Sequence, residues 1–317
     1  MAGFELYAPR TARHRRTWTW AVLVLAFVFI ILGQIAAAVP IGIERAMAIH
    51  ADPAVAKTPV HIDMAQFMLL SNVVGISLTL LWVWLFERRA PSAIGLGAGP
   101  WRFLRGCLMG GVLFSLVTGL MYALGGLNVV GGGAWQAPTA AALLPLLVYA
   151  GTFAVQGSGE EIVTRGWMLQ VISSRHGLAW GIAANALFFG FLHAFNEKPA
   201  PDLYMGLFNI VLYAIFISLY AAKERTLWGA CGIHAAWNYV QGPGFGLDVS
   251  GLKLGVAPLF VHLADKPGAA EWLTGGNFGP EASVATTAVM GAGIVWMLLR
   301  GVPKPAESFA VTDVPAA

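Results

Sequence analysis

Charged side chains are scarce in this chain of 317 residues. Asp, Glu, Lys and Arg make up 11% of it, whereas they make up about 25% of a typical soluble domain. Hydrophobic residues account for 57%, and the mean hydropathy is +0.69. This deficit of charge argues against a soluble domain and predicts a polytopic membrane protein.

Cysteine and long basic runs are also nearly absent. The two cysteines, Cys107 and Cys231, lie far apart in apolar segments and neither belongs to a CxxC pair. A disulfide framework or a thiolate metal site is therefore not expected. The formal charge is only +3 and no cluster of Lys and Arg is extended, so we expect no nucleic-acid partner. No internal repeat is found.

The N-terminal segment resembles a secretory signal at first sight, because four arginines precede an apolar run. That run extends from about 18 to 43, which exceeds the apolar core of a signal peptide, and no small-x-small cleavage site follows a short core. We therefore interpret it as a retained first span.

Eight segments are long and apolar enough, or nearly so, to cross a bilayer core, which takes about 20 residues per helix. Placing the N-terminus inside puts 14 of the 19 Lys and Arg residues on the inner side, as the positive-inside bias requires. The fold class expected is an all-α membrane bundle with both termini cytoplasmic. The segments are 18–40, 65–86, 104–126, 139–160, 178–196, 203–222, 226–242 and 283–300.

The whole chain, 1–317, is expected to form a single membrane domain. Its polar core lies within 140–242, and the longest connection is an outer loop at 243–282 in which Gly and Pro recur. We expect an ordered loop there rather than a re-entrant segment. The tail at 303–317 is short and is expected to be disordered.

Ionisable residues within spans are costly and mark functional sites by default. Of the 16 acidic residues, only Glu160 and Glu161 are expected in or against a span. Arg165, His193 and His234 complete the ionisable set. The amides in this part of the chain are Asn185, Asn209 and Asn238.

Helical spacing predicts different surroundings for Glu160 and Glu161. Glu161 and Arg165 are four residues apart with the acid first, which is the favourable order for an ion pair on a helix. Glu160 is rotated by about 100° from Glu161 and is free to point elsewhere. The alternative is that all three residues form only a structural ion network at a helix end.

The histidines show the same spacing of four. Phe189 precedes His193, so its ring can support the imidazole, and Asn185 continues that face. His234 precedes Asn238, so that both side chains can project toward one point. Gly229 and Gly232 lie nearby and permit close helix approach. The alternatives are a core histidine bonded to a carbonyl and an asparagine that joins two helices.

Two chemistries fit these residues. A carboxylate beside a histidine can take a proton from water, while a second histidine with an amide donates hydrogen bonds to an oxyanion. The other possibility is that two histidines and a glutamate hold Zn²⁺ with one open position. The spacing alone leaves both open.

Three motifs in order give a more specific indication. Residues 160–165 read EExxxR, 189–193 read FxxxH, and 234–238 read HxxxN. This order resembles the type II CAAX prenyl endopeptidases and the CPBP (CAAX protease and bacteriocin-processing enzyme, or Abi) family, over roughly 140–242. The loop sequence WLTGGNFGPEAS resembles bacterial members.

The resemblance implies an intramembrane endopeptidase. In it, Glu160 and His193 would activate water, and His234 and Asn238 would stabilise the oxyanion. Glu161 and Arg165 would support the site. The family has been described both as metal-dependent and as metal-free. We favour no cofactor, because an asparagine four residues from His234 suits an oxyanion better than zinc.

If zinc is present, its ligands would be Glu160, His193 and His234. The partners expected are the lipid bilayer and a membrane-associated peptide or protein substrate. The expected location is the bacterial cytoplasmic (inner) membrane.

Three other functions were considered. Ser158 lies between two glycines and could serve a rhomboid-like serine protease with a histidine base. A proton-coupled transporter would use similar polar residues, but such proteins often show repeated halves. A catalytically silent membrane scaffold is the third.

Overall fold

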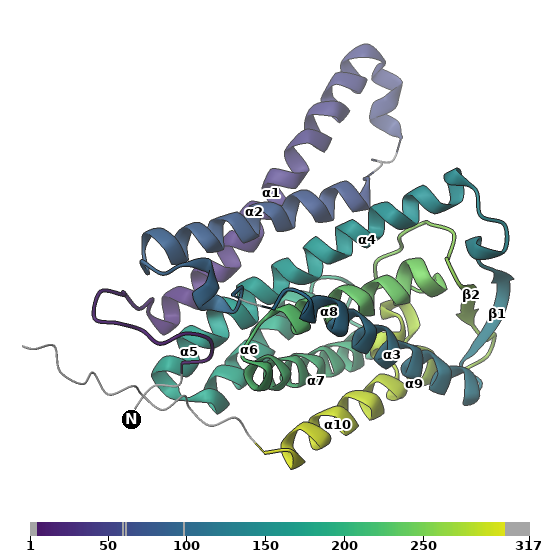
Figure 1. Ribbon diagram of the computed structural model, residues 1–317. Coiled ribbons are helices and arrows are strands. Elements are labelled where there is room, and N and C mark those ends of the chain that lie inside the picture. Colours follow the sequence, from purple (N-terminus) through teal and green to yellow (C-terminus); the bar gives the residue numbers. More distant parts are fainter. Residues whose placement is uncertain (1–4, 59, 61, 98, 302–317) are drawn as a thin grey trace, which may run out of the picture.

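The computed structural model describes residues 5–58, 60, 62–97 and 99–301, which form a helical bundle with one small sheet (Figure 1). The predicted tail at 303–317 lies outside the described residues. It includes Lys304, one of the 14 basic residues predicted on the inner side. The helices are α1 Thr19–Ala51, α2 Met64–Leu85, α3 Arg102–Ala123, α4 Ala140–Glu161, α5 Leu169–His176, α6 Leu178–His193, α7 Pro201–Glu224, α8 Trp228–Tyr239, α9 Glu271–Thr274 and α10 Val284–Leu299.

Each of the eight predicted spans contains a helix. Within the described residues, five helical segments are long and apolar enough to cross a membrane: α1, α2, α3, α7 and the continuous segment Ala140–His176. Helices α6 and α10 are apolar but have 16 residues each, and α8 has 12. A helical membrane protein is therefore confirmed, whereas eight spans and cytoplasmic termini stay predictions.

The helical segment continues beyond Glu161, where α4 ends. A π-helical turn, Ile162–Met168, follows Glu161 and leads directly into α5. The next turn lies at Gly177, whose φ of 91° favours glycine. The predicted spans 139–160 and 178–196 leave residues 161–177 as a connection between them. These residues are instead mostly buried, and α5 packs against α6.

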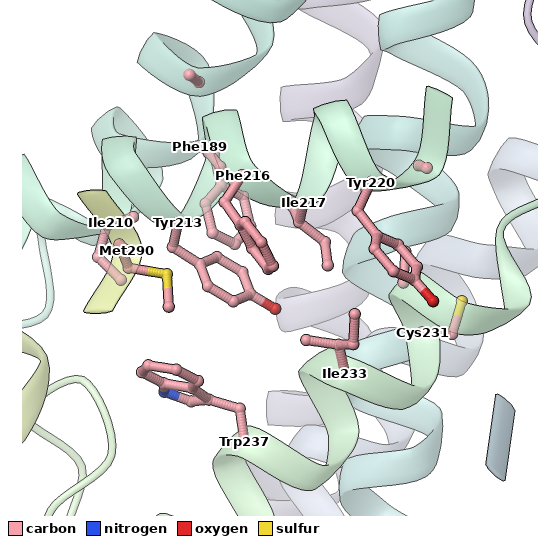
Figure 2. Packing of buried hydrophobic residues seen from close by; sticks show 14 of the residues in the cluster. Phe189, Ile210, Tyr213, Phe216, Ile217, Tyr220, Cys231, Ile233, Trp237 and Met290 are labelled. Carbon is pink, nitrogen blue, oxygen red and sulfur yellow. The ribbon is translucent and has the colours of Figure 1, made fainter. Parts of the chain in front are cut away.

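Helix α8 lies inside the bundle, in contact with α3, α4 and α7 (Figure 1). Its contact with α3 is close because glycines face backbone: a Cβ at Gly232 would lie 2.8 Å from the Cys107 amide nitrogen. On its other side, Ile233 and Trp237 face Tyr213 of α7 and its neighbours (Figure 2). This packing fixes the position of the helix that carries His234 and Asn238.

Residues 243–282, the predicted outer loop, contain a strand that the sequence did not predict. Strand β2, Val261–Asp265, pairs antiparallel with β1, Leu127–Gly132, which follows α3. The register shifts between Val129 and Gly131. The pair lies at one end of the bundle (Figure 1) and holds the loop against the helices.

Candidate active site

All four predicted catalytic side chains line one cavity. Glu160, His193, His234 and Asn238 border a volume of about 620 Å³ enclosed by residues of α1, α2, α4, α6, α7 and α8. Phe189 lines it too. Three separate stretches of sequence therefore meet at one place within the helices.

Glu160 is the acid that faces this cavity. Its Oε1 accepts a hydrogen bond from the Gln156 side-chain amide, one turn earlier in α4. Its Oε2 lies 3.8 Å from Nε2 of His234 and is buried without a hydrogen-bond partner in the described part of the chain. This oxygen is therefore free to accept a proton from a reactant.

Glu161 pairs with Arg165, as the helical argument predicted. Its Oε1 lies 3.2 Å from Nη1 of Arg165, and both side chains are fully buried. The Arg165 guanidinium lies 4.3 Å from the centre of the Phe189 ring and also donates to the Thr164 hydroxyl. Arg165 thereby neutralises one carboxylate and leaves Glu160 without such a partner.

His234 connects the two glutamates. Its Nδ1 lies 2.8 Å from Oε1 of Glu161, and an ionised carboxylate only accepts hydrogen bonds. Nδ1 must therefore carry a proton, which leaves Nε2 directed toward Glu160. The ring is held edge-on by Tyr213 at 5.5 Å and by Phe189 at 6.1 Å, measured between ring centroids.

His193 has its tautomer set by the backbone. Its Nδ1 lies 2.8 Å from the Phe189 carbonyl oxygen, which can only accept, so Nδ1 carries the proton and Nε2 is free to accept. The Phe189 ring also lies 4.7 Å from the imidazole centroid, as the spacing of four indicated. The carbonyl bond expected of an ordinary core histidine is present, yet the ring borders the cavity.

One family comparison bears on these residues. The segment 141–240 matches the family described as "Rce1-like: Type II CAAX prenyl endopeptidase Rce1-like". This part of the chain is similar to the Rce1-like family, and we call residues 141–240 the Rce1-like segment. The resemblance predicted from the three motifs is confirmed. No match was found among curated proteins, and none among solved structures.

The Rce1-like segment contains every residue of the three motifs. Since this is a family of proteases, the match supports a membrane peptidase at the level of the family. Together with the long apolar helices, it supports an integral membrane protein.

Gln156 is a residue of the Rce1-like segment that sequence reasoning missed. It is 7% exposed, and its Oε1 accepts a bond of 2.9 Å from Nδ2 of Asn238. The same side chain donates to Glu160, so one amide connects two predicted catalytic residues from different helices. Gln156 lies four residues before Glu160, on the same face of the helix, and this spacing could have identified it as a neighbour of Glu160.

Glu281 is a second residue that was missed. The expectation that only Glu160 and Glu161 lie in or against a span was wrong, because Glu281 is 4% exposed and lines the cavity. Burial raises the pKa of its carboxyl group, while hydrogen bonds from Gln241 and Ser250 oppose that effect. It belongs to the outer loop, where only the tertiary structure brings it near the Rce1-like segment.

Two predicted neighbours of the site serve the surrounding framework. Asn185 donates to the Thr164 carbonyl at 2.7 Å and thus supports the π-helical turn after Glu161. Ser158 is not among the residues that line the cavity, so its position gives no support to a serine protease.

A zinc ion held by Glu160, His193 and His234 was the alternative to metal-free chemistry. Within the described ranges, no three His, Cys, Asp or Glu side chains are arranged to hold a metal ion. The hydrogen bonds from Nδ1 of His193 to a carbonyl and of His234 to Glu161 do not themselves exclude a metal, because a metal-ligating histidine also bonds through its other nitrogen. The residues as placed do not fit a zinc site, and we derive no step through one.

Proposed function

We propose that the protein is an intramembrane endopeptidase that hydrolyses peptide bonds with a water molecule activated by Glu160 and His193. The observation that carries this proposal is the convergence of an acid, two imidazoles and an amide on one cavity between apolar helices. The sequence match to the Rce1-like family, which is independent of the cavity, also supports this proposal.

The first step is attack of water on the peptide carbonyl. The free Oε2 of Glu160 accepts one proton of the water, and the Nε2 lone pair of His193 accepts a hydrogen bond from the other. The water oxygen bonds to the carbonyl carbon, and the carbonyl oxygen becomes an oxyanion. Protonated Glu160 then returns the proton to the leaving amine as the C–N bond breaks.

His234 and Asn238 are placed to stabilise the oxyanion. Because Nδ1 of His234 donates to Glu161, the ring must carry a second proton on Nε2 to donate to the substrate. Glu161 beside one nitrogen and Glu160 near the other supply the negative charge that such a cation requires. The Asn238 amide has one N–H engaged with Gln156 and a second for the oxyanion.

The substrate is proposed to be a membrane-associated peptide or protein, in the bacterial cytoplasmic membrane. The test is a comparison of membrane-protein termini between cells that carry the wild-type protein and cells that carry Glu160→Gln. New termini that require Glu160 would identify substrates. Identical termini in the two strains would argue for a scaffold or transporter instead.

Asn238→Ala is expected to lower kcat about a hundredfold, the usual effect of removing one oxyanion donor. The other predicted catalytic side chains remain, so some activity should persist. Peptide cleavage by the purified variant in detergent measures this, with Asn277→Ala in the outer loop as a control. Wild-type activity in Asn238→Ala would remove this residue from the oxyanion site.

Gln156→Leu is expected to lower kcat about tenfold. It removes two hydrogen bonds, to Glu160 and from Asn238, each worth on the order of 1 kcal/mol, and so leaves both side chains less well oriented. Gln66→Leu, at an exposed position of α2, is the matched control. If both variants cleave at the same rate, Gln156 does not orient the site.

A further inference from the structure

Part of the cavity lining comes from the loop 243–282 rather than from a helix. Val249, Ser250 and Leu252 all line the cavity, and they belong to a tight turn in which the Val249 amide donates to the Leu252 carbonyl at 3.0 Å. We call residues 248–252 the outer wall.

Ser250 holds this wall in a conformation that a serine does not readily adopt. Its φ is 48°, in the left-handed region that is unfavourable for a residue with a Cβ. Both of its donors reach the same acid: the backbone amide lies 2.6 Å from Oε2 of Glu281, and the hydroxyl lies 2.9 Å from Oε1. These two bonds offset the strain.

Glu281 also joins the wall to the helix that carries His234 and Asn238. Its Oε2 accepts from Nε2 of Gln241 at 2.8 Å, and the same Gln241 nitrogen donates to the Asp248 carbonyl at 2.6 Å. Gln241 lies in the π-helical turn Val240–Gly244 that directly follows α8. A single buried carboxylate therefore holds both the wall and the end of α8.

A further bond ties the wall to the other catalytic helix. Asn196, three residues after His193, donates from Nδ2 to the Ser250 carbonyl at 3.0 Å. All three donors to the Glu281 carboxylate are neutral groups. Because hydrogen bonds to a buried charged group are stronger than those between neutral groups, loss of the charge should loosen the wall.

We propose that Glu281 is a positioning residue for substrate binding, which holds residues 248–252 as the outer wall of the cavity. The proposal rests on the proposed peptidase function. The wall borders the cavity, and no hydrogen bond joins it to Glu160 among the described residues, so it should affect mainly how tightly a peptide is held. Loss of the Glu281 charge should therefore raise KM more than it lowers kcat.

The position of the wall can be measured without any peptidase activity. Lys253 directly follows the wall, and its side chain is 80% exposed. The other lysine of the loop, Lys266, precedes Pro267, where trypsin does not cut. Cleavage after Lys253 therefore reports on this segment alone within 243–282.

Glu281→Gln is expected to speed tryptic cleavage after Lys253 about tenfold, from the loss of one bond to a charged group. Glu271→Gln, which removes an exposed acid from the same loop, should leave the rate unchanged. Ser250→Ala removes only the hydroxyl bond and should give a smaller acceleration in the same direction. It keeps the test decisive if Glu281→Gln fails to fold. A wild-type rate in Ser250→Ala and in folded Glu281→Gln would overturn the proposal.

The kinetic test uses a peptide that the wild-type protein cleaves. Glu281→Gln should raise KM about tenfold with kcat within about threefold, in line with one lost bond, and Ser250→Ala should follow with a smaller change. Faster tryptic cleavage with an unchanged KM would overturn the role in binding. If the wild-type protein cleaves no peptide, the proposed function and the binding role both fail. Faster tryptic cleavage after Lys253 in Glu281→Gln would then show only that Glu281 holds the wall in place.

Discussion

Glu160→Gln is expected to reduce peptide cleavage below detection while the protein stays folded. Glutamine keeps the shape of the side chain and can still bond to Gln156, but its amide cannot accept the proton of the attacking water. General acid–base catalysis is worth up to about 10⁴-fold in rate, so kcat should fall by roughly that factor. KM should change little, because no binding contact is lost.

The position of Glu160 makes this substitution a clean test. Its Oε2 has no hydrogen-bond partner in the described residues, so the substitution removes only the long contact of 3.8 Å with Nε2 of His234 and leaves the Glu161–Arg165 pair intact. Purified protein should therefore give the wild-type elution profile and melting temperature. Glu44→Gln, at an exposed position of α1, is the matched control. Activity equal to that of this control would defeat the assignment of Glu160 as the base.

His234→Ala is expected to lower kcat about a thousandfold, the upper range for loss of an oxyanion donor. The substitution removes the Nε2 donor next to Glu160 and also the bond from Nδ1 to Glu161. Arg165 still pairs with Glu161, so the protein should fold, although with a lower melting temperature. The measurement is kcat for the purified variant, normalised to folded protein.

Two further variants separate charge from packing at this position. His234→Gln keeps an amide donor and should recover part of the activity lost in His234→Ala. His262→Ala, at an exposed position of β2, should behave as wild type. If His234→Ala matches His262→Ala in kcat, then His234 serves only to join α8 to Glu161.

Local spacing in the sequence was enough to predict the pairs within single helices. The Glu161–Arg165 ion pair, the contact of Phe189 with His193 and the close approach at Gly232 all followed from positions one turn apart or from small side chains. The order of the three motifs also indicated the family, which the match over 141–240 confirmed. Helix geometry determines such neighbours whatever the rest of the fold does.

The contacts between helices followed only from the tertiary structure. The bond from Asn238 to Gln156, the approach of His234 to both glutamates, and the attachment of the wall to Glu281 join residues 31 to 82 positions apart. In a soluble helix the polar face shows which side is exposed, but here lipid and protein interior are both apolar. The hydropathy pattern therefore predicts where helices lie along the chain, and only their packing decides which faces meet around the cavity.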